Sequence, residues 1–265
     1  MGLRTATSRL LGVLGLGLFF LAARVLGAPG GQITVYYYDP AAGIQTPAVT
    51  DQKIQGYLEK SGATLAIKTF ATLKELAATI AKEPPDFVVV PPYLKGQINA
   101  PSLTPLLARQ RDGRTTYEMI MVGPGKITEL KGKTLAASGD AAQPVFLDEI
   151  LLKGTGLSAK DLHVLPVGKD IDGVLAAGQG QAAVAAASQA SVALVKKANP
   201  AVAGNLGELH KVSNIPFAVL FSFGSPPAAS VATVKEVFSG FAAKGPEGQK
   251  ILKLLKTDKW VEAPK

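Results

Sequence analysis

Apolar positions recur along this chain in two periods, and the change from one period to the other predicts strands that alternate with helices. Short runs of β-branched and aromatic residues are typical of strands, whereas apolar side chains three or four positions apart indicate the buried face of a helix. The expected strands in the first third of the chain are residues 33–38, 64–70 and 87–90, and the expected helices between them are residues 51–61 and 72–82. Because parallel strands need a crossover, which is usually helical, this order predicts a parallel sheet with helices packed on it.

The same pattern returns in the middle of the chain, around a turn of small and polar residues. An apolar run over residues 134–137 ends at Ser138, and apolar side chains then recur at helical spacing over residues 145–152. The first backbone N–H groups of a helix have no partner within it, so residues 138–143 would present free donors at the end of the strand. The sequence therefore predicts a cradle for an anion or a polar ligand at this turn.

Two tyrosines follow predicted strand ends in the first part of the chain. Tyr38 ends the first strand and precedes Asp39, while the run 87–90 stops at two prolines before Tyr93. Proline cannot donate a ladder hydrogen bond, so a central strand ends there. Ligands of open parallel sheets lie outside the carboxyl ends of the strands, which predicts one rim carrying Tyr38, Asp39 and Tyr93. The alternative is that the tyrosines fill the space between two lobes without touching a ligand.

Two breaks in the later pattern predict that the chain passes twice between two lobes. Glycine and proline interrupt the predicted strand 117–122 just after Val122, and Pro216 interrupts an extended stretch over residues 206–222. The expected lobes are residues 32–121 plus 215–265 for the first and residues 122–214 for the second, which is inserted into the first. The tail is expected to add two amphipathic helices to the first lobe, residues 231–243 and 247–256.

The N-terminus has the pattern of a secretory signal peptide. Arg4 and Arg9 precede an uncharged apolar stretch of about 14 residues, and small residues follow it near Ala28, which predicts cleavage after residues 1–28. A membrane anchor is the alternative, but a spanning helix needs about 20 apolar residues. We therefore expect a secreted, periplasmic protein. Removing the segment takes away three arginines and no acidic residue, so the formal net charge falls from +8 to +5.

Composition and failed motifs exclude several classes of function. The chain has no cysteine, which excludes disulfides and cysteine metal sites, and its two histidines, His163 and His210, have no ligand cluster beside them in the sequence. The scattered cations do not form the basic patch of a nucleic-acid binder. A P-loop would need a glycine at Ile127, and no Gly-x-Ser-x-Gly is present. We expect no catalytic residue, no metal, no cofactor and no nucleic-acid partner.

Several segments together resemble a known family. The segments are Leu130-Lys-Gly-Lys-Thr-Leu-Ala136, Lys153-Gly-Thr-Gly-Leu157, Leu162-His-Val-Leu-Pro-Val-Gly168 and Val174-Leu-Ala-Ala-Gly-Gln-Gly-Gln-Ala-Ala-Val-Ala185. Their order resembles the second lobe of type II periplasmic solute-binding proteins, in particular the phosphonate, sulfonate and nitrate group of ABC transporters. The resemblance spans roughly residues 33–261. It implies a two-lobed α/β fold with mostly parallel sheets and flanking helices.

The resemblance also implies a function, and the strand ends and the two crossings between the lobes supply a set of candidate contacts. A small polar or anionic ligand, phosphonate-like or sulfonate-like, would be captured between the lobes for a membrane transporter permease, and the protein would be a monomer. The candidate ligand contacts are Tyr38, Asp39, Tyr93, Tyr117, Ser138, Gln143, Ser188 and Asn214. Ser138 would donate to an oxyanion, while Gln143 and Ser188 would fix its orientation.

Two departures from the family pattern keep an alternative open. The last short strand lacks the family's acidic residue at Ala182 or Ala183, and the helix start holds one hydroxyl and Asp140 where relatives have a run of serine and threonine. An acid at a helix start opposes a second negative charge. The ligand is then neutral, zwitterionic or absent. If it is absent, the protein is a periplasmic sensing or scaffold module on the same fold.

Overall fold

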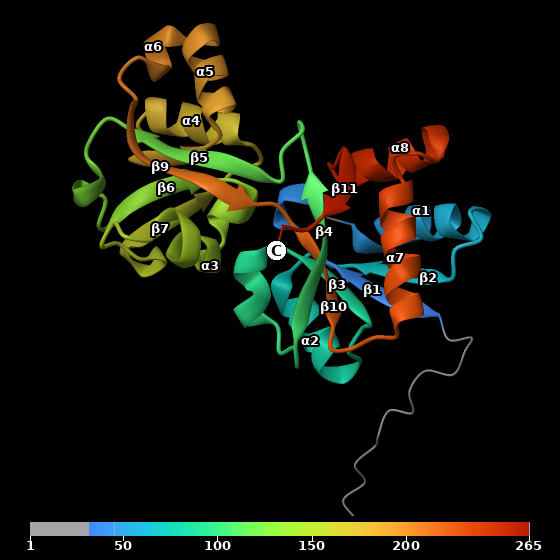
Figure 1. The fold of residues 1–265 in the computed structure, drawn as a ribbon. Helices are drawn as coiled ribbons and strands as arrows, with labels where there is room; N and C mark the ends of the chain where they lie inside the picture. Colours follow the sequence, from blue (N-terminus) through green and yellow to red (C-terminus); the bar gives the residue numbers. More distant parts are fainter. Residues whose placement is uncertain (1–31, 45, 265) are drawn as a thin grey trace, which may run out of the picture. The chain divides into compact units, whose positions relative to one another are not determined.

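Two β-sheets with helices on their faces make up the protein in a computed structural model that describes residues 32–44 and 46–264 (Figure 1). The expected signal peptide, residues 1–28, lies outside the described residues. Within residues 32–264, no helix combines the length and the apolar character needed to cross a membrane.

The first sheet, among the described residues, has six strands in the order β11-β4-β10-β3-β1-β2. They are β1 (Ile33–Tyr37), β2 (Leu65–Thr69), β3 (Phe87–Val90), β4 (Leu103–Gln110), β10 (Val219–Phe223) and β11 (Lys259–Glu262). β1 pairs in parallel with β2 and β3, as the alternation of strands and helices predicts. The sheet is mixed, because β10 and β11 return from later parts of the chain and pair antiparallel.

Helices cover both faces of the first sheet (Figure 1). They are η1 (Pro40–Ala42), α1 (Pro47–Lys60), α2 (Leu73–Lys82), η2 (Pro92–Gln97), α7 (Ala228–Gly240) and α8 (Gly245–Leu254). Successive side chains of a strand point to opposite faces. Val35 and Tyr37 accordingly pack with α1, α7 and α8, whereas Tyr36 and Tyr38 pack with α2 and η2.

The second sheet has the strand order β7-β6-β8-β5-β9. Its strands are β5 (Thr116–Gly123), β6 (Lys133–Ala137), β7 (Leu162–Pro166), β8 (Val184–Ala187) and β9 (Gly207–Pro216). Its helices are η3 (Ile127–Glu129), η4 (Gly139–Ala142), α3 (Pro144–Phe146), the π-helical turn η5 (Leu147–Leu151), η6 (Ala159–Asp161), α4 (Asp170–Gly178), α5 (Gln189–Ala198) and α6 (Pro200–Ala203). α4, α5 and α6 cover one face, and α3 with η5 covers the other (Figure 1).

Two details differ from the sequence-based expectation. All of β5 belongs to the second sheet, so the chain first changes sheet over residues 111–115 and not near Val122. The second change falls at residues 217–218, next to the expected position. The expected helix over residues 145–152 is a short α-turn that continues as the π-turn η5, because its hydrogen bonds widen at Leu152, whose N–H donates to the Leu147 carbonyl at 2.8 Å.

Close packing of α8 against the end of α7 depends on Gly248. A Cβ atom added there would lie 2.2 Å from the backbone oxygen of Phe241, which no side-chain rotation relieves. We expect Gly248→Ala to destabilise the protein by about 1–3 kcal/mol, measured by urea unfolding. Gly56→Ala is the matched control, because that helical position has no atom within 4 Å of an added Cβ. It should raise stability by about 0.5–1 kcal/mol, and equal effects in the two variants would contradict the packing argument.

Candidate functional site

A buried ion pair links the end of β1 to β4. The Arg109 guanidinium donates to the Asp39 carboxylate, and both side chains are almost completely buried, with 0% and 1% exposed. Arg109 also donates to the Lys256 carbonyl at 2.6 Å and lies over the Phe217 ring, 4.9 Å from its centroid. Burial lowers the pKa of Arg109, but Asp39 and the nearby Tyr37 outweigh it and leave the pKa raised. The guanidinium is therefore held charged inside the protein.

A second carboxylate, Asp140, lies buried in the turn after β6. The Tyr117 hydroxyl, on β5, donates to Asp140 Oδ2 at 3.0 Å. Burial, followed by the negative charge of Asp39, raises the pKa of Asp140 to about 7, and the hydrogen bond from Tyr117 only partly offsets this rise. Asp140 consequently changes charge near neutral pH.

Tyrosines surround these charged groups. Burial, and then Asp140, raise the pKa values of both Tyr93 and Tyr117 above the ordinary range, so both hydroxyls stay protonated. The Tyr93 ring packs edge-on against Phe146 of α3 at 5.2 Å, which joins η2 to the second sheet. We call Asp39, Arg109, Asp140 and Tyr37, Tyr93, Tyr117 the polar cluster.

Two buried atoms of the polar cluster, Tyr37 Oη and Arg109 Nε, have no hydrogen-bond partner among the described residues. The Tyr93 hydroxyl interacts with the Asp140 carboxylate and, like Tyr117, acts to lower its pKa. Buried polar groups normally find partners, so the two unpaired atoms need an explanation. With both carboxylates ionised, the cluster carries one net negative charge.

Asp170 accepts hydrogen bonds from two of the second-sheet residues that were predicted to contact an oxyanion. This residue begins α4, and its carboxylate accepts from Ser138 Oγ at 2.6 Å and from the backbone N–H of Ser188 at 2.8 Å. The Ser188 hydroxyl caps α5 by accepting from the Ser191 N–H at 3.3 Å. The expected anion cradle thus already contains a carboxylate of the protein itself.

A pocket of about 450 Å³ brings Tyr38 and Gln143 together. Its lining residues are Tyr38, Ala71, Thr72, Leu73, Lys74, Ala77, Gln97 and Gln143. Lys74 is the only lining side chain that carries a full charge. Burial, and then Asp140, raise the pKa of Tyr38 to about 12, so the charge of the polar cluster reaches the wall of this pocket. The pocket therefore offers one cation, Lys74, and a Tyr38 hydroxyl that stays protonated.

Residues 51–265 match the sequence family described as the periplasmic substrate-binding protein of the phosphonate ABC transporter. The chain belongs to this family of phosphonate-type periplasmic substrate-binding proteins. The family consists of binding proteins and not of enzymes. A search of curated protein sequences gives no match.

Solved structures agree on the fold. XAC2383 from Xanthomonas citri, bound to chloride ion, has a TM-score of 0.61 at 18% identity, covering 88% of this chain and 91% of that chain. A binding protein component of an ABC phosphonate transporter from Pseudomonas aeruginosa has a TM-score of 0.56 at 12% identity, and the match covers 87% of this chain and 81% of that chain. PhnD1 from Prochlorococcus marinus, in complex with methylphosphonate, has a TM-score of 0.55 at 13% identity, and the match covers 87% of this chain and 92% of that chain. The type II fold implied by the sequence resemblance is confirmed. The expectation of mostly parallel sheets is wrong, because both sheets are mixed and contain antiparallel pairs.

The structure distributes the candidate contacts of this substrate-binding protein over four places. Tyr38 and Gln143 share the pocket. Asp39, Tyr93 and Tyr117 belong to the polar cluster, whereas Ser138 and Ser188 face Asp170. Asn214 is exposed in β9 with a φ of 59° and makes none of these contacts.

Sequence reasoning missed Arg109, Asp170 and Lys74. A single arginine behind the apolar residues 106–108 was a signal for Arg109, because a charge in a buried strand needs a partner. Asp170 follows a strand end of the second sheet, as Ser138 does, and the same rim rule would have included it. Lys74 gave no signal, since an exposed lysine in the first turn of a helix is common. Within residues 32–44 and 46–264, no group of three or more His, Asp or Glu side chains could hold a metal ion.

Proposed function

We propose that this protein captures a small polar or singly charged anionic solute in the pocket beside Tyr38 and Gln143. The observation that carries the proposal is the pocket itself, which joins a residue after β1 of the first sheet to one before α3 of the second. Its volume of about 450 Å³ lies within the range of small-molecule sites. Family membership supports a substrate-binding role for it.

The charges around the pocket limit the ligand. Lys74 favours one anionic group, while the buried Asp140, whose charge raises the pKa of Tyr38, disfavours a second negative charge. A zwitterion satisfies both conditions, because its ammonium group can face the carboxylates while its anionic group faces Lys74. We therefore propose sulfonates and zwitterionic anions in preference to dianions.

The proposal includes a transport role. The mature chain, after cleavage of residues 1–28, would act as a monomer in the periplasm and deliver the solute to the permease of an ABC transporter. The two passages between the sheets, at residues 111–115 and 217–218, would serve as the hinge, so that ligand binding closes the two sheets on each other.

Calorimetric titration of the mature protein with methanesulfonate, taurine and methylphosphonate tests this function. At least one probe should bind with a dissociation constant near the micromolar range, and taurine should bind more tightly than methanesulfonate because it adds an ammonium group. Lys74→Ala should weaken the binding about tenfold, since a hydrogen bond to a charged group contributes about 1.5–3 kcal/mol before solvent screening.

Lys82→Ala is the matched control, because Lys82 is an exposed lysine at the other end of α2. It should leave the affinity unchanged. Equal losses in the two variants would contradict a pocket beside Lys74, and tighter binding of methylphosphonate as a dianion would contradict the charge argument.

A sensing or scaffold module on the same fold is the second candidate function, and one observation favours it. Asp170 and Asp140 occupy the positions from which the second sheet would contact an oxyanion. Such a module would give no heat with any of the three probes.

A further inference from the structure

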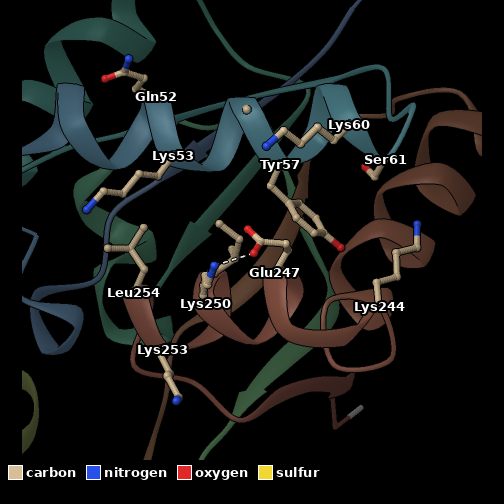
Figure 2. Close-up of a pocket in the computed structure, with 12 residues that line it drawn as sticks. Gln52, Lys53, Tyr57, Lys60, Ser61, Lys244, Glu247, Lys250, Lys253 and Leu254 are labelled. Atoms are coloured by element: carbon tan, nitrogen blue, oxygen red, sulfur yellow. Dashed lines mark hydrogen bonds and ion pairs between the residues drawn. The ribbon is translucent and has the colours of Figure 1, made fainter.

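A second concave surface, lined by lysines, lies between α1 and α8. It encloses about 920 Å³, and Figure 2 shows Tyr57 of α1 and Glu247 of α8 in the space between the two helices, with lysine side chains around them. We call it the lysine groove. Its lining residues are Gln52, Lys53, Gly56, Tyr57, Lys60, Ser61, Lys244, Glu247, Lys250, Ile251, Lys253 and Leu254.

Positive charge is concentrated on the rims of the lysine groove. Five lysines and one glutamate line it, all of them exposed. Glu247 pairs with Lys250, and this contact lowers the pKa of Glu247. In the part of the chain that the structure describes, the other four lysines have no carboxylate within ion-pair distance. Four unpaired like charges around one hollow repel each other and attract an anion.

The floor of the lysine groove is apolar. Ile251 and Leu254 of α8 line it together with Gly56 and Tyr57 of α1. No atom lies within 4 Å of a Cβ added at Gly56, so the space above this residue is open. The Tyr57 ring packs on Phe241 at 5.4 Å, and its hydroxyl oxygen is buried. The floor therefore offers apolar area to an occupant.

The spacing of the lysines distinguishes between possible occupants. Lys53 and Lys60 are seven residues apart on α1, which separates them by about 10 Å along the helix axis. Lys250 and Lys253 repeat the charge along α8 on the other rim. A compact phosphate would reach one end of this arrangement and leave the apolar floor uncovered. A helix with an apolar stripe between two acidic flanks would match the floor and both rims.

We propose that the lysine groove docks an acidic amphipathic helix of a partner protein. The groove consists only of first-sheet helices, on the face that packs against Val35 and Tyr37, whereas the pocket beside Tyr38 lies on the α2 face. Docking therefore does not require a solute, and the two proposals can fail separately.

The absence of cysteine from the chain allows a direct test. Gln52→Cys places a fluorophore on the exposed rim of the groove. The probe is a peptide of about 18 residues, or five helical turns, with leucines at helical spacing and glutamates on both flanks. We expect saturable binding at low salt that weakens as salt is raised, and no binding of a scrambled peptide with the same composition.

Charge reversal identifies the surface. Lys53→Glu/Lys253→Glu should weaken peptide binding at least about tenfold, while melting curves should stay unchanged because both lysines are exposed and unpaired. The matched control, Lys153→Glu/Lys160→Glu, changes the same net charge at two exposed second-sheet lysines and should retain binding.

Three outcomes would overturn the proposal. An equal loss of peptide affinity in the two double variants would mean that the net charge of the protein attracts the peptide nonspecifically. Tighter binding of inorganic tripolyphosphate than of the peptide would mean a small-anion site. Binding of vesicles containing phosphatidylglycerol, without binding of the peptide, would mean a membrane-facing surface.

Discussion

Asp39→Ala is expected to destabilise the protein by about 3–5 kcal/mol, because the substitution leaves the buried Arg109 guanidinium without its carboxylate. Asp39 has a second local contact, since it accepts from the Ala41 N–H at 3.0 Å at the start of η1, and that contact is lost as well. The loss should appear as a lower midpoint of urea unfolding at pH 7 with an unchanged slope.

Two variants separate the buried charge from the other effects of this substitution. Asp39→Ala/Arg109→Met removes both charges and should be more stable than Asp39→Ala alone. Glu262→Ala breaks a pair with Lys235 in which the glutamate is 73% exposed, and it should cost no more than about 1 kcal/mol. A loss in Asp39→Ala as small as that of Glu262→Ala would mean that Arg109 finds water or another partner.

Asp140→Asn should make the protein more stable at pH 8 and leave its stability nearly unchanged at pH 4. The native pKa of Asp140, about 7, lies above the ordinary value of 3.8, so between these pH values the native state holds a proton that the unfolded chain has released. The stability contributed by protonated Asp140 is therefore complete below about pH 4 and is lost as the pH rises through 7. The free energy of unfolding can fall by about 1.4 kcal/mol per pH unit in this range. Wild type and Asp140→Asn should therefore differ by a few kcal/mol at pH 8.

The measurement is the free energy of urea unfolding of wild type and Asp140→Asn at pH 4, 6 and 8. Glu118→Gln is the control. Hydrogen bonds from Lys211 and Ser213 lower the pKa of Glu118, so its contribution has the opposite sign and is lost as the pH falls. Parallel stability curves for wild type and Asp140→Asn would mean that Asp140 is ionised throughout this range.

The elements that local patterns define were predictable from the sequence. The spacing of apolar residues predicts β1, β2, β3 and the two helices between them, because each is specified by its own residues and lies in sequence order. β4 was not predicted. Pro105 interrupts its pattern, and the structure accommodates it at an irregularity where β4 has one extra residue opposite β10, with Leu220 paired with Leu107 and Phe221 with Pro105.

The candidate site was predictable only as a set of strand ends. The rim rule selected Tyr38, Asp39, Tyr93 and Ser138, but it could not say which polar groups satisfy each other. Ser138 and Asp170 are far apart in the sequence. Asp39 follows β1 and Arg109 lies on β4, and these two strands are not neighbours in the sheet. Such pairings are decided by the packed structure, so the sequence overestimated the donors available to an anion.

The place of β10 in the first sheet has a consequence for the order of folding. β10 pairs with β3 and β4, yet it follows the whole second sheet in the chain, so the centre of the first sheet can be completed only after the second sheet has been synthesised. The second sheet shortens this distance once it has folded. β5 and β9 pair from Thr116 with Pro216 onward, which holds the ends of β4 and β10 together and removes most of the loop-closure entropy of their pairing. Once folded, the inserted segment thus favours the pairing of β4 with β10 in the sheet into which it is inserted.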